Sequence, residues 1–590
     1  MPVHGTHFFA NPSTGFYNEA VSTSLSLASG ASSYLHRTHS SAGNRRTFTL
    51  STWVKLSNLG TTRTFFKGGT NDQDNFLVRF DAGNQLKVFN NASNSPNLNL
   101  ITNRVFVDTG AWMNVTVAVD TTQSTEANRV KVYINGTQET SFGTSTYPSL
   151  NLETNANNSV KHWIGAKFDG STIEHYYDGY LSYFHLVDGS ALDPTNFGET
   201  KNGVFIPKAT GGLTYGTNGF RLEFKNTSVG SGSASTIGAD TSGNTLHFDS
   251  VNVDASDCAL PDCPENNFGT FITTFKQSNS QTFTYGSRQV TTSSGGRPYV
   301  PLNIRIPPDS GKWFWEFRVN NSGAGMGIMR INQKPHTGVG YLGAAESVTS
   351  TGTGTQSTDG YYGDNHWVHY ADNYSHNGSA TSLSGSNSYP EVLGCLFDST
   401  SGSENIAWYR GGTAIGNVNV DAGFEYIPVA TDGSGAVSRN VIVNCGQDST
   451  FRGNESAGSN KDANDIGLFS MAVPTDAKAV CTANLPEPTL GPNSAEHVSD
   501  HFQVIEYTGD DGSTQAITGV GFQPDLVWHK ESSSGTGAFF SMDSSRGAQI
   551  YLKIPATDNE VDSSGDLYTS FDSDGFTVGT DDVSNKNGDV

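Results

Sequence analysis

The chain has 590 residues, of which 57 are acidic and 34 basic, so its formal net charge is −23 at pH 7. This charge disfavours binding to nucleic acid or to anionic membrane surfaces. Only 15% of the residues are charged, whereas glycine occurs 66 times, a composition typical of short strands joined by polar turns. We therefore predict an all-β protein with very little helix, divided into about two to four domains.

Residues 1–20 show no hydrophobic periodicity and contain neither the basic n-region nor the apolar core of a signal peptide. No apolar run in the chain approaches the roughly 18 residues of a membrane span. We expect a chain that folds in the cytoplasm of the cell that makes it and does not insert into membranes. Residues 1–20 are predicted to form an attachment arm that becomes ordered against a neighbouring protein.

From residue 21 to residue 255, strand-like runs alternate with turns rich in Gly, Asn and Asp. Apolar and polar residues alternate most clearly in FTLSTWVKL (48–56) and RVKVYI (129–134), as in strands with one buried face. Asn135-Gly136 is a strong hairpin signal, because both residues tolerate positive φ. Further strands are predicted at 75–80, 85–89, 112–119 and 163–168, with a closing strand in YYDGYLSYFHLVDGSALDPTNFGE (176–199).

The strings TLSTWVKL, WMNVTVAVD, VKVYINGTQ, WIGAKFDG and YYDGYLSYFHLVDGSAL occur in this order and together resemble the laminin-G-type, concanavalin A-like jelly roll. Two strings that include turns, AGNRRTFTLSTWVK and DGSALDPTNFGE, resemble more narrowly the laminin-G-like modules of virion proteins of tailed phages, especially marine ones. The resemblance implies a β-sandwich over residues 21–255. Trp53, Trp112 and Trp163 are expected to pack between its two sheets rather than to bind a ligand.

A second domain is predicted at 266–484, after a boundary marked by Gly, Ser, Pro and Asn. Its runs KWFWEFRV, EVLGCLFD and NIAWYRGGTAIG, followed by FEYIP, resemble the SPRY/B30.2 sandwich, another concanavalin-like architecture. Between these strands lies a long polar segment, residues 332–390. We predict that this segment is a binding loop, since long insertions in compact domains often are.

Within this segment, the run GYYGDNHWVHY concentrates aromatic and polar side chains. Its rings could stack on the face of a sugar while its carboxyl and amide groups bond to the hydroxyls. The alternative is that the loop packs on its own sandwich or on a neighbouring subunit. The predicted ligand-binding residues are Tyr361, Tyr362, Asp364, Asn365, His366, Trp367, His369 and Tyr370.

A Pro-rich linker is predicted at 485–499, and a third module at 500–590. The runs HFQVIEYTGDDGSTQAITGVGFQPDLVWHK, SMDSSRG and TSFDSDGFTVGTDD resemble a small β-module found at the C-termini of the same phage proteins. That module normally continues through another aromatic strand. The sequence therefore predicts a module that is either shortened here or completed by another segment.

The residues predict no enzymatic chemistry. Glycan-cleaving jelly rolls place two carboxylates on one strand face, and no Glu-x-Asp-x-Glu or Glu-x-Asp-x-x-Glu run occurs. Glu223 and Glu316 are isolated strand acids, expected to face solvent or to pair with Arg. No nucleophile elbow, P-loop or dinucleotide-binding glycine motif stands between a strand and a helix.

Five cysteines are too few for a disulfide framework. Cys395 and Cys445 lie in apolar runs and are expected to be buried. Cys258 and Cys263 could close a small loop, but the two further ligands that a zinc site needs are not evident.

Metal sites are not assignable from the remaining residues. His366 and His369 have a spacing that suits metal ligation on a helix, but their Gly/Asn-rich surroundings do not favour one. Acidic pairs could bind calcium, yet none follows EF-hand spacing. The pairs are 72/74, 510/511, 572/574 and 581/582. No cofactor is predicted.

The phage resemblance implies a non-enzymatic virion protein, assembled in the host cytoplasm and released by lysis. We expect a tail fibre or similar receptor-binding appendage, joined to other virion proteins through its N-terminal arm and adhering to glycans of the host cell surface. A homo-oligomer is expected, and a trimer by resemblance to fibres in general, although no heptad pattern drives it. The alternatives are a purely structural capsid fibre or decoration protein and a polysaccharide depolymerase.

Overall fold

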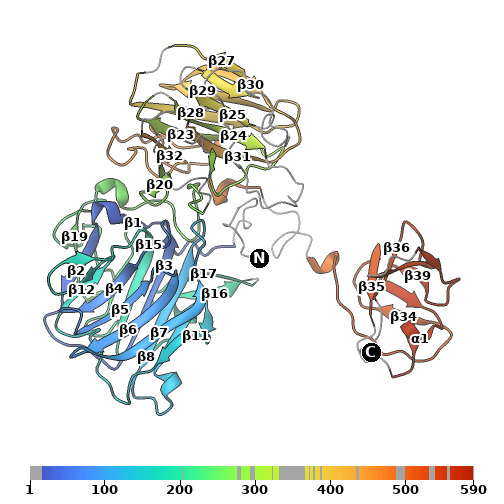
Figure 1. Cartoon of the computed structure of the whole chain (residues 1–590), viewed down its shortest axis with the longest axis horizontal. Coiled ribbons are helices and arrows are strands. Elements are labelled where there is room, and N and C mark those ends of the chain that lie inside the picture. Colours follow the sequence, from blue (N-terminus) through green and yellow to red (C-terminus); the bar gives the residue numbers. More distant parts are fainter. Residues whose placement is uncertain are drawn as a thin grey trace. The chain divides into compact units, whose positions relative to one another are not determined.

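In the computed structural model, the regular secondary structure is almost entirely β-strand (Figure 1). It describes residues 16–588 except 202, 275–280, 293–298, 322, 331–365, 371–372, 377–378, 386–387, 433–437, 487–497, 531–538 and 555–558. The predicted all-β class is confirmed, and no helix among these residues is long and apolar enough to span a membrane. The chain divides into two compact units, Met1–Pro486 and Glu487–Val590.

The helices among the described residues are short. The single α-helix is α1 (Asp582–Asn585). The 3-10 turns are η1 (Ser29–Ala31), η2 (Glu126–Asn128), η3 (Pro194–Asn196), η4 (Ala255–Asp257), η5 (Thr482–Asn484) and η6 (Val498–Asp500).

The first unit opens with two stacked antiparallel sheets, here called sandwich 1. In spatial order, its first sheet contains β1 (Leu25–Leu27), β15 (Gly179–Asp188), β3 (Thr47–Leu56), β8 (Met113–Asp120), β9 (Val130–Ile134) and β10 (Thr137–Glu139), with β18 (Phe220–Leu222) also beside β15. Its second sheet contains β11 (Phe142–Thr146), β7 (Ser95–Val105), β6 (Gln85–Ala92), β5 (Asn75–Phe80), β4 (Arg63–Gly69), β12 (Lys161–Ile164), β2 (Tyr34–Thr38) and β19 (Asp249–Val251). Two hairpins are separate from these sheets: β13 (Lys167–Phe168) with β14 (Ile173–Glu174), and β16 (Gly198–Lys201) with β17 (Val204–Pro207).

Alternation along β3 decides which side chains enter the core of sandwich 1. Its main-core residues share one parity: Phe48, Leu50, Val54 and Leu56. Trp53 has the other parity and stacks on Phe205 with 5.9 Å between ring centroids. Trp112 and Trp163 also belong to small outer clusters. The expectation that the three tryptophans pack between the sheets is therefore wrong, because they lie on the outer faces.

The predicted hairpin at Asn135-Gly136 is confirmed, with φ of 48° and 77° between β9 and β10. The predicted closing strand at 176–199 forms β15. It pairs with β3 on one side and with β1 on the other, so it lies inside the first sheet rather than at its end.

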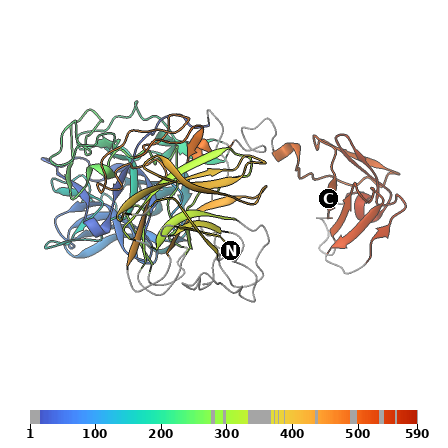
Figure 2. The same cartoon turned by 90° about the horizontal axis from the view of Figure 1, so that it is seen from above.

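The second half of this unit is another pair of sheets, here called sandwich 2 (Figure 2). One sheet contains β20 (Gln281–Thr284), β21 (Gln289–Thr292), β32 (Arg439–Asn444), β23 (Lys312–Val319), β28 (Glu391–Asp398), β29 (Asn405–Arg410) and β30 (Thr413–Asn419), with β33 (Ala477–Ala479) parallel to β23. The other contains β22 (Tyr299–Pro301), β31 (Tyr426–Asp432), β24 (Ala324–Arg330), β25 (His366–Tyr370), β26 (Asn373–His376) and β27 (Ser379–Ser382).

The predicted binding loop at 332–390 is partly regular structure. Residues from His366 onward form β25, β26 and β27, a meander that extends the second sheet from β24. The expectation of a structureless insertion is therefore wrong for this part. Residues 331–365 lie outside the described residues.

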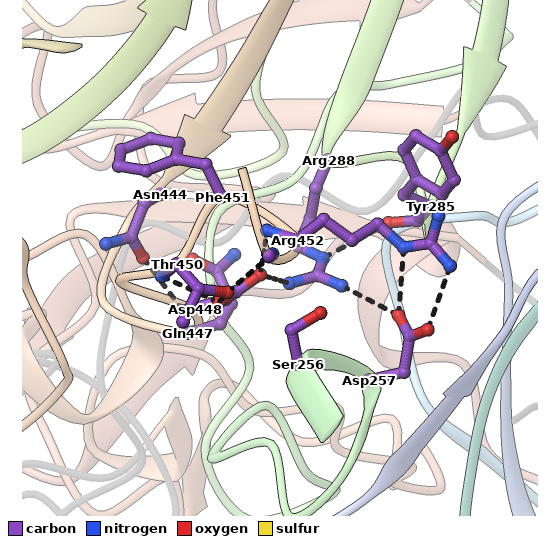
Figure 3. Close-up of polar contacts among 12 residues, drawn as sticks. Ser256, Asp257, Tyr285, Arg288, Asn444, Gln447, Asp448, Thr450, Phe451 and Arg452 are labelled. Carbon is purple, nitrogen blue, oxygen red and sulfur yellow. Dashed lines mark hydrogen bonds and ion pairs between the residues drawn. The ribbon is translucent and has the colours of Figure 1, made fainter. Parts of the chain in front are cut away.

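A buried polar junction, shown in Figure 3, links sandwich 1 to sandwich 2. The guanidinium of Arg288 donates to Asp448 at 2.8 Å and lies 3.5 Å from Asp257, which follows sandwich 1. Arg452 donates to Asp257 at 2.9 and 3.1 Å and covers the ring of Tyr285 at 3.6 Å from its centroid. The charges of this cluster are therefore paired across the junction.

A second group of polar contacts lies at the same boundary. Lys55 of β3 is fully buried and donates to Asp262 at 2.8 Å and to Asn267 at 2.5 Å. The Tyr180 hydroxyl donates to the carbonyl of Gly286 at 2.8 Å. Buried charges need such partners, and those of Lys55 come from the segment that connects the two sandwiches. The junction accounts for the assignment of both sandwiches to one compact unit.

The second unit has its own apolar core. One sheet contains β34 (Gln515–Thr518), β40 (Gly575–Val578) and β39 (Tyr568–Asp572). The other contains β35 (Leu526–His529), β36 (Phe539–Asp543), β37 (Ile550–Ile554) and β38 (Val561–Asp562). The boundary between the units, after Pro486, falls within the stretch predicted as a linker.

Candidate functional site

The structure places only part of the predicted ligand-binding set. Tyr361, Tyr362, Asp364 and Asn365 lie outside the described residues. His366 and Tyr370 belong to β25, but the positions of their side chains are likewise outside the description.

Trp367 and His369 are buried in β25, with exposed fractions of 1% and 0%. The ring of Trp367 packs edge-on against Tyr426 at 5.6 Å, and that of His369 against Phe317 at 5.8 Å. Their prediction as sugar-stacking residues is therefore wrong, because both rings lie inside sandwich 2. For the other six residues it stays a prediction.

A different set of rings lies on the outer face of the second sheet of sandwich 1. Register places Trp163 of β12 directly opposite His36 of β2 and Lys67 of β4, so the three share that face. Trp163 stacks on Phe168 of β13, with 5.6 Å between centroids and 25° between the planes. Tyr34 and Tyr176 belong to the same cluster, here called the aromatic face.

The hairpin of β13 and β14 lies over this face and is anchored by Lys167. The Lys167 ammonium lies 2.8 Å from a carboxylate oxygen of Asp72 and 2.8 Å from one of Glu174. The Asp72 backbone N–H also donates to the carbonyl of Asp169 at 3.1 Å. The side chains of Asp72 and Glu174 remain 43% and 38% exposed. The partly exposed side chains of Asp72 and Glu174 therefore lie beside the rings, although Oδ1 of Asp72 is itself buried.

Burial and hydrogen bonding set the charge states on this face. Burial lowers the pKa of Lys67 to about 8. The Lys67 ammonium donates to the Gly69 carbonyl and lies 4.6 Å from the centroid of the Trp163 ring. The hydrogen bond from Lys167 lowers the pKa of Glu174. Bonds from the backbone and hydroxyls of its own turn lower the pKa of Asp169. These carboxyls are thus ionised at neutral pH, whereas a glycosidase acid requires a raised pKa.

Carboxyl groups with raised pKa values are found elsewhere, within the folded core. Burial raises the pKa of Glu316 to about 7, although Ser470 N, Met471 N and Asn444 Nδ2 donate to its carboxylate. Burial also raises the pKa of Asp178, which accepts from two serine hydroxyls. Such fully buried carboxyls hold loops in place and do not face a substrate.

The expectation that Glu316 faces solvent or pairs with Arg is therefore wrong, because its side chain is buried and accepts a hydrogen bond from Asn444. Glu223 does pair with Arg221 at 3.1 Å, and also with Lys225 at 2.7 Å, as expected.

The cysteines carry no disulfide. All five are free and buried, so Cys258 and Cys263 do not close a loop, whereas the expected burial of Cys395 and Cys445 is confirmed. Burial raises the pKa of the Cys263 thiol to about 12, which makes it a poor nucleophile at neutral pH. Among the described residues, no group of three or more His, Cys, Asp or Glu could hold a metal.

The sequence contains a signal for the aromatic face. The segment from Trp163 to Tyr176 places several rings within a few residues of Lys167 and Glu174. A position within a strand predicts a core role for Trp163, but alternation alone does not say which face of a strand is covered.

Comparison with known proteins bears on two parts of the chain. No curated protein matches it. Among solved structures, it is similar to the SPRY domain of human HERC1 (19% identity, 28% of this chain and 90% of that chain, TM-score 0.19). It is also similar to a SAP-like pentraxin from Limulus polyphemus (16% identity, 31% and 76%, TM-score 0.21) and to a putative carbohydrate binding protein from Bacteroides ovatus (12% identity, 39% and 58%, TM-score 0.27).

Family models match both ends of the described chain. Residues 497–590 match a domain of unknown function, DUF7483. Residues 29–196, which include β2 to β15 and the whole hairpin of the aromatic face, match the model described as the concanavalin A-like lectin/glucanases superfamily. The concanavalin A-like resemblance predicted from the strand strings is thus confirmed for this part of the chain.

Proposed function

We propose that the protein is a non-enzymatic adhesion component of a phage particle, which binds neutral glycans of the host surface through the aromatic face. One observation carries this proposal: half-buried Phe168 and Tyr176 lie beside the partly exposed side chains of Asp72 and Glu174, which Lys167 of the β13–β14 hairpin ties together. Sugar rings stack on such side chains, and their hydroxyls donate to carboxylate oxygens. The net charge of −23 disfavours acidic polysaccharides.

The virion assignment is supported by the strings that resemble modules of tailed-phage proteins. In this proposal, residues 1–20 attach the chain to other virion proteins, and the particle is assembled in the host cytoplasm and released by lysis. Several linked copies would engage one cell surface together, which raises avidity without new contacts.

The test is a glycan array probed with the full chain, followed by affinity measurements on the glycan bound best. Replacing Phe168 and Tyr176 together by Ala is expected to weaken binding about tenfold or more, because two stacking surfaces of roughly 1 kcal/mol each are removed. Phe424→Ala serves as the matched control, since this ring is 41% exposed on sandwich 2.

Four other outcomes would redirect the proposal. Unchanged binding by the double variant removes the aromatic face from it. Binding that is lost only with Tyr361→Ala and Tyr362→Ala moves the site to the segment first predicted. If the wild-type chain binds no glycan and does not adsorb to host cells, the purely structural capsid-fibre or decoration role is favoured. New reducing ends on incubation with host polysaccharide would instead indicate a depolymerase.

A further inference from the structure

One sheet of the second unit carries apolar side chains on both faces, of which one packs in the core and the other is exposed. Val527 of β35 and its partner Met542 of β36 lie in the core of this unit. The residues of opposite parity, Leu526 and Trp528, face away from that core and are 57% and 70% exposed. Phe539 of β36 shares this outer face and is 44% exposed. A sheet with two apolar faces requires a second covering layer.

The outer face continues across the sheet. Phe539 is opposite Ile554, and Ser541, the partner of Trp528, is opposite Leu552. Among the described residues of the chain, the Phe and Trp side chains that are at least 41% exposed are Phe424, Phe502, Trp528 and Phe539, of which three belong to the second unit. Exposed apolar patches of this kind mark protein contacts.

The strand that carries most of this exposed surface is also a sheet edge. In the order β35-β36-β37-β38, β35 is the terminal strand among the described residues. Antiparallel strands expose alternate N–H and C=O groups along such an edge, which can pair with another strand.

β35 itself lacks the acidic residues that would repel a second copy of the same strand as its partner. Residues 487–590 contain 4 basic and 18 acidic residues, a net charge of 4 − 18 = −14, yet Leu526–His529 contains no carboxylate. Lys530, whose ammonium lies 4.8 Å from the Phe539 centroid, adjoins the strand. Two acidic modules thus meet with least repulsion along β35.

We propose that β35 pairs antiparallel with β35 of a second copy of this chain, about a two-fold axis through Val527. In this register Leu526 of each copy lies opposite Trp528 of the other on the outer face, and Asp525 lies opposite His529 rather than another carboxylate. Two-fold symmetry keeps outer faces on the same side, so the two four-stranded sheets become one continuous sheet. The apolar cross-strand pairs and the edge hydrogen bonds stabilise the contact.

The first test is the mass of the full chain in sedimentation velocity over a wide concentration range. The wild type is expected to change from 62.9 kDa to twice this mass as concentration rises. Leu526→Lys with Trp528→Lys is expected to raise the dissociation constant about a hundredfold or more, since it removes the central apolar contacts. Leu150→Lys and Val204→Lys, at positions 52% and 48% exposed in the first unit, should dimerise like the wild type.

Salt and cross-linking test the nature and the register of the contact. Added NaCl should tighten the dimer, because it screens repulsion between two acidic modules. With Leu526→Cys and Trp528→Cys in the same chain, an intermolecular disulfide should form on oxidation, since opposed residues lie within disulfide range. Each single substitution should cross-link far less, and the native cysteines are all buried.

A wild type that remains at 62.9 kDa at every concentration overturns the proposal. A trimer that persists in the variant with Leu526→Lys and Trp528→Lys also overturns the proposal. Equal cross-linking by the single and double Cys variants would refute the register. Circular dichroism and the melting temperature of the Lys variant should match the wild type, which separates loss of pairing from loss of folding.

Discussion

Arg288→Met tests the claim that a buried charge cluster holds the two sandwiches together. The Arg288 side chain is 2% exposed, and the carboxylates of Asp448 and Asp257 beside it are 6% and 1% exposed. Removing one partner of a buried pair typically destabilises a protein by about 3–5 kcal/mol. Asp257 keeps Arg452, and Asp448 keeps donors from Thr450. We therefore expect a loss of about 3 kcal/mol, at the lower end of that range.

The assay is urea unfolding of the full chain, followed by tryptophan fluorescence and by circular dichroism. The matched control is Lys461→Met, which removes an exposed pair with Asp465 whose side chains are 44% and 84% exposed. This control should lose less than about 0.5 kcal/mol. A loss for Arg288→Met no larger than that of Lys461→Met would refute the reasoning that the junction is a stabilising contact.

Three further predictions concern stability. Burial lowers the pKa of His39 to about 4 from 6.5, so acid protonates this residue in the unfolded chain first. The free energy of unfolding should therefore fall by up to about 1.4 kcal/mol per pH unit as the pH drops from 6.5 toward 4. Thermal melts of His39→Gln should show a shallower decline with pH, and a slope identical to that of the wild type would contradict this prediction. Burial raises the pKa of Glu316 to about 7 from 4.5, so its contribution should be lost as pH rises from 4.5 through 7. Glu316→Gln should remove that dependence but lose about 1–3 kcal/mol in urea titrations, because the amide NH2 must oppose the N–H donor of either Ser470 or Met471. A stability equal to that of the wild type would count against this prediction. Gly136→Ala should lower the free energy of unfolding by about 1–2 kcal/mol or more, since φ is 77° and a Cβ would lie 2.5 Å from the Phe205 ring. The control is calorimetry on Gly203→Ala, where φ is 79° but nothing lies within 4 Å of the new Cβ. Comparing the two variants separates the steric clash from the backbone strain.

Much of the strand content could be predicted from local pattern. The strands predicted at Asn75–Phe80, Lys312–Val319 and Glu391–Asp398 occur with these same bounds. Each is a run with apolar side chains bounded by turn residues, so the information lies within the run itself.

The candidate site was much less predictable. Trp367 and His369 lie in a polar, Gly-rich stretch that looks like a loop, yet both are buried and their rings pack against Tyr426 of β31 and Phe317 of β23. The aromatic face instead uses Trp163, whose side of the strand cannot be read from alternation. In both cases the deciding fact is which face another segment covers, and that segment is remote in the chain.

The sequence by itself determined the fold class, the main strands and the concanavalin A-like pattern of residues 29–196, because strand periodicity and turn chemistry act over a few residues. Only the tertiary structure decided which charges pair. Lys55 meets Asp262 across 207 positions, and Arg288 meets Asp448 across 160. It also decided that Glu316 is buried and that Trp528 is exposed. Burial and long-range pairing depend on how remote segments pack, which no local pattern contains.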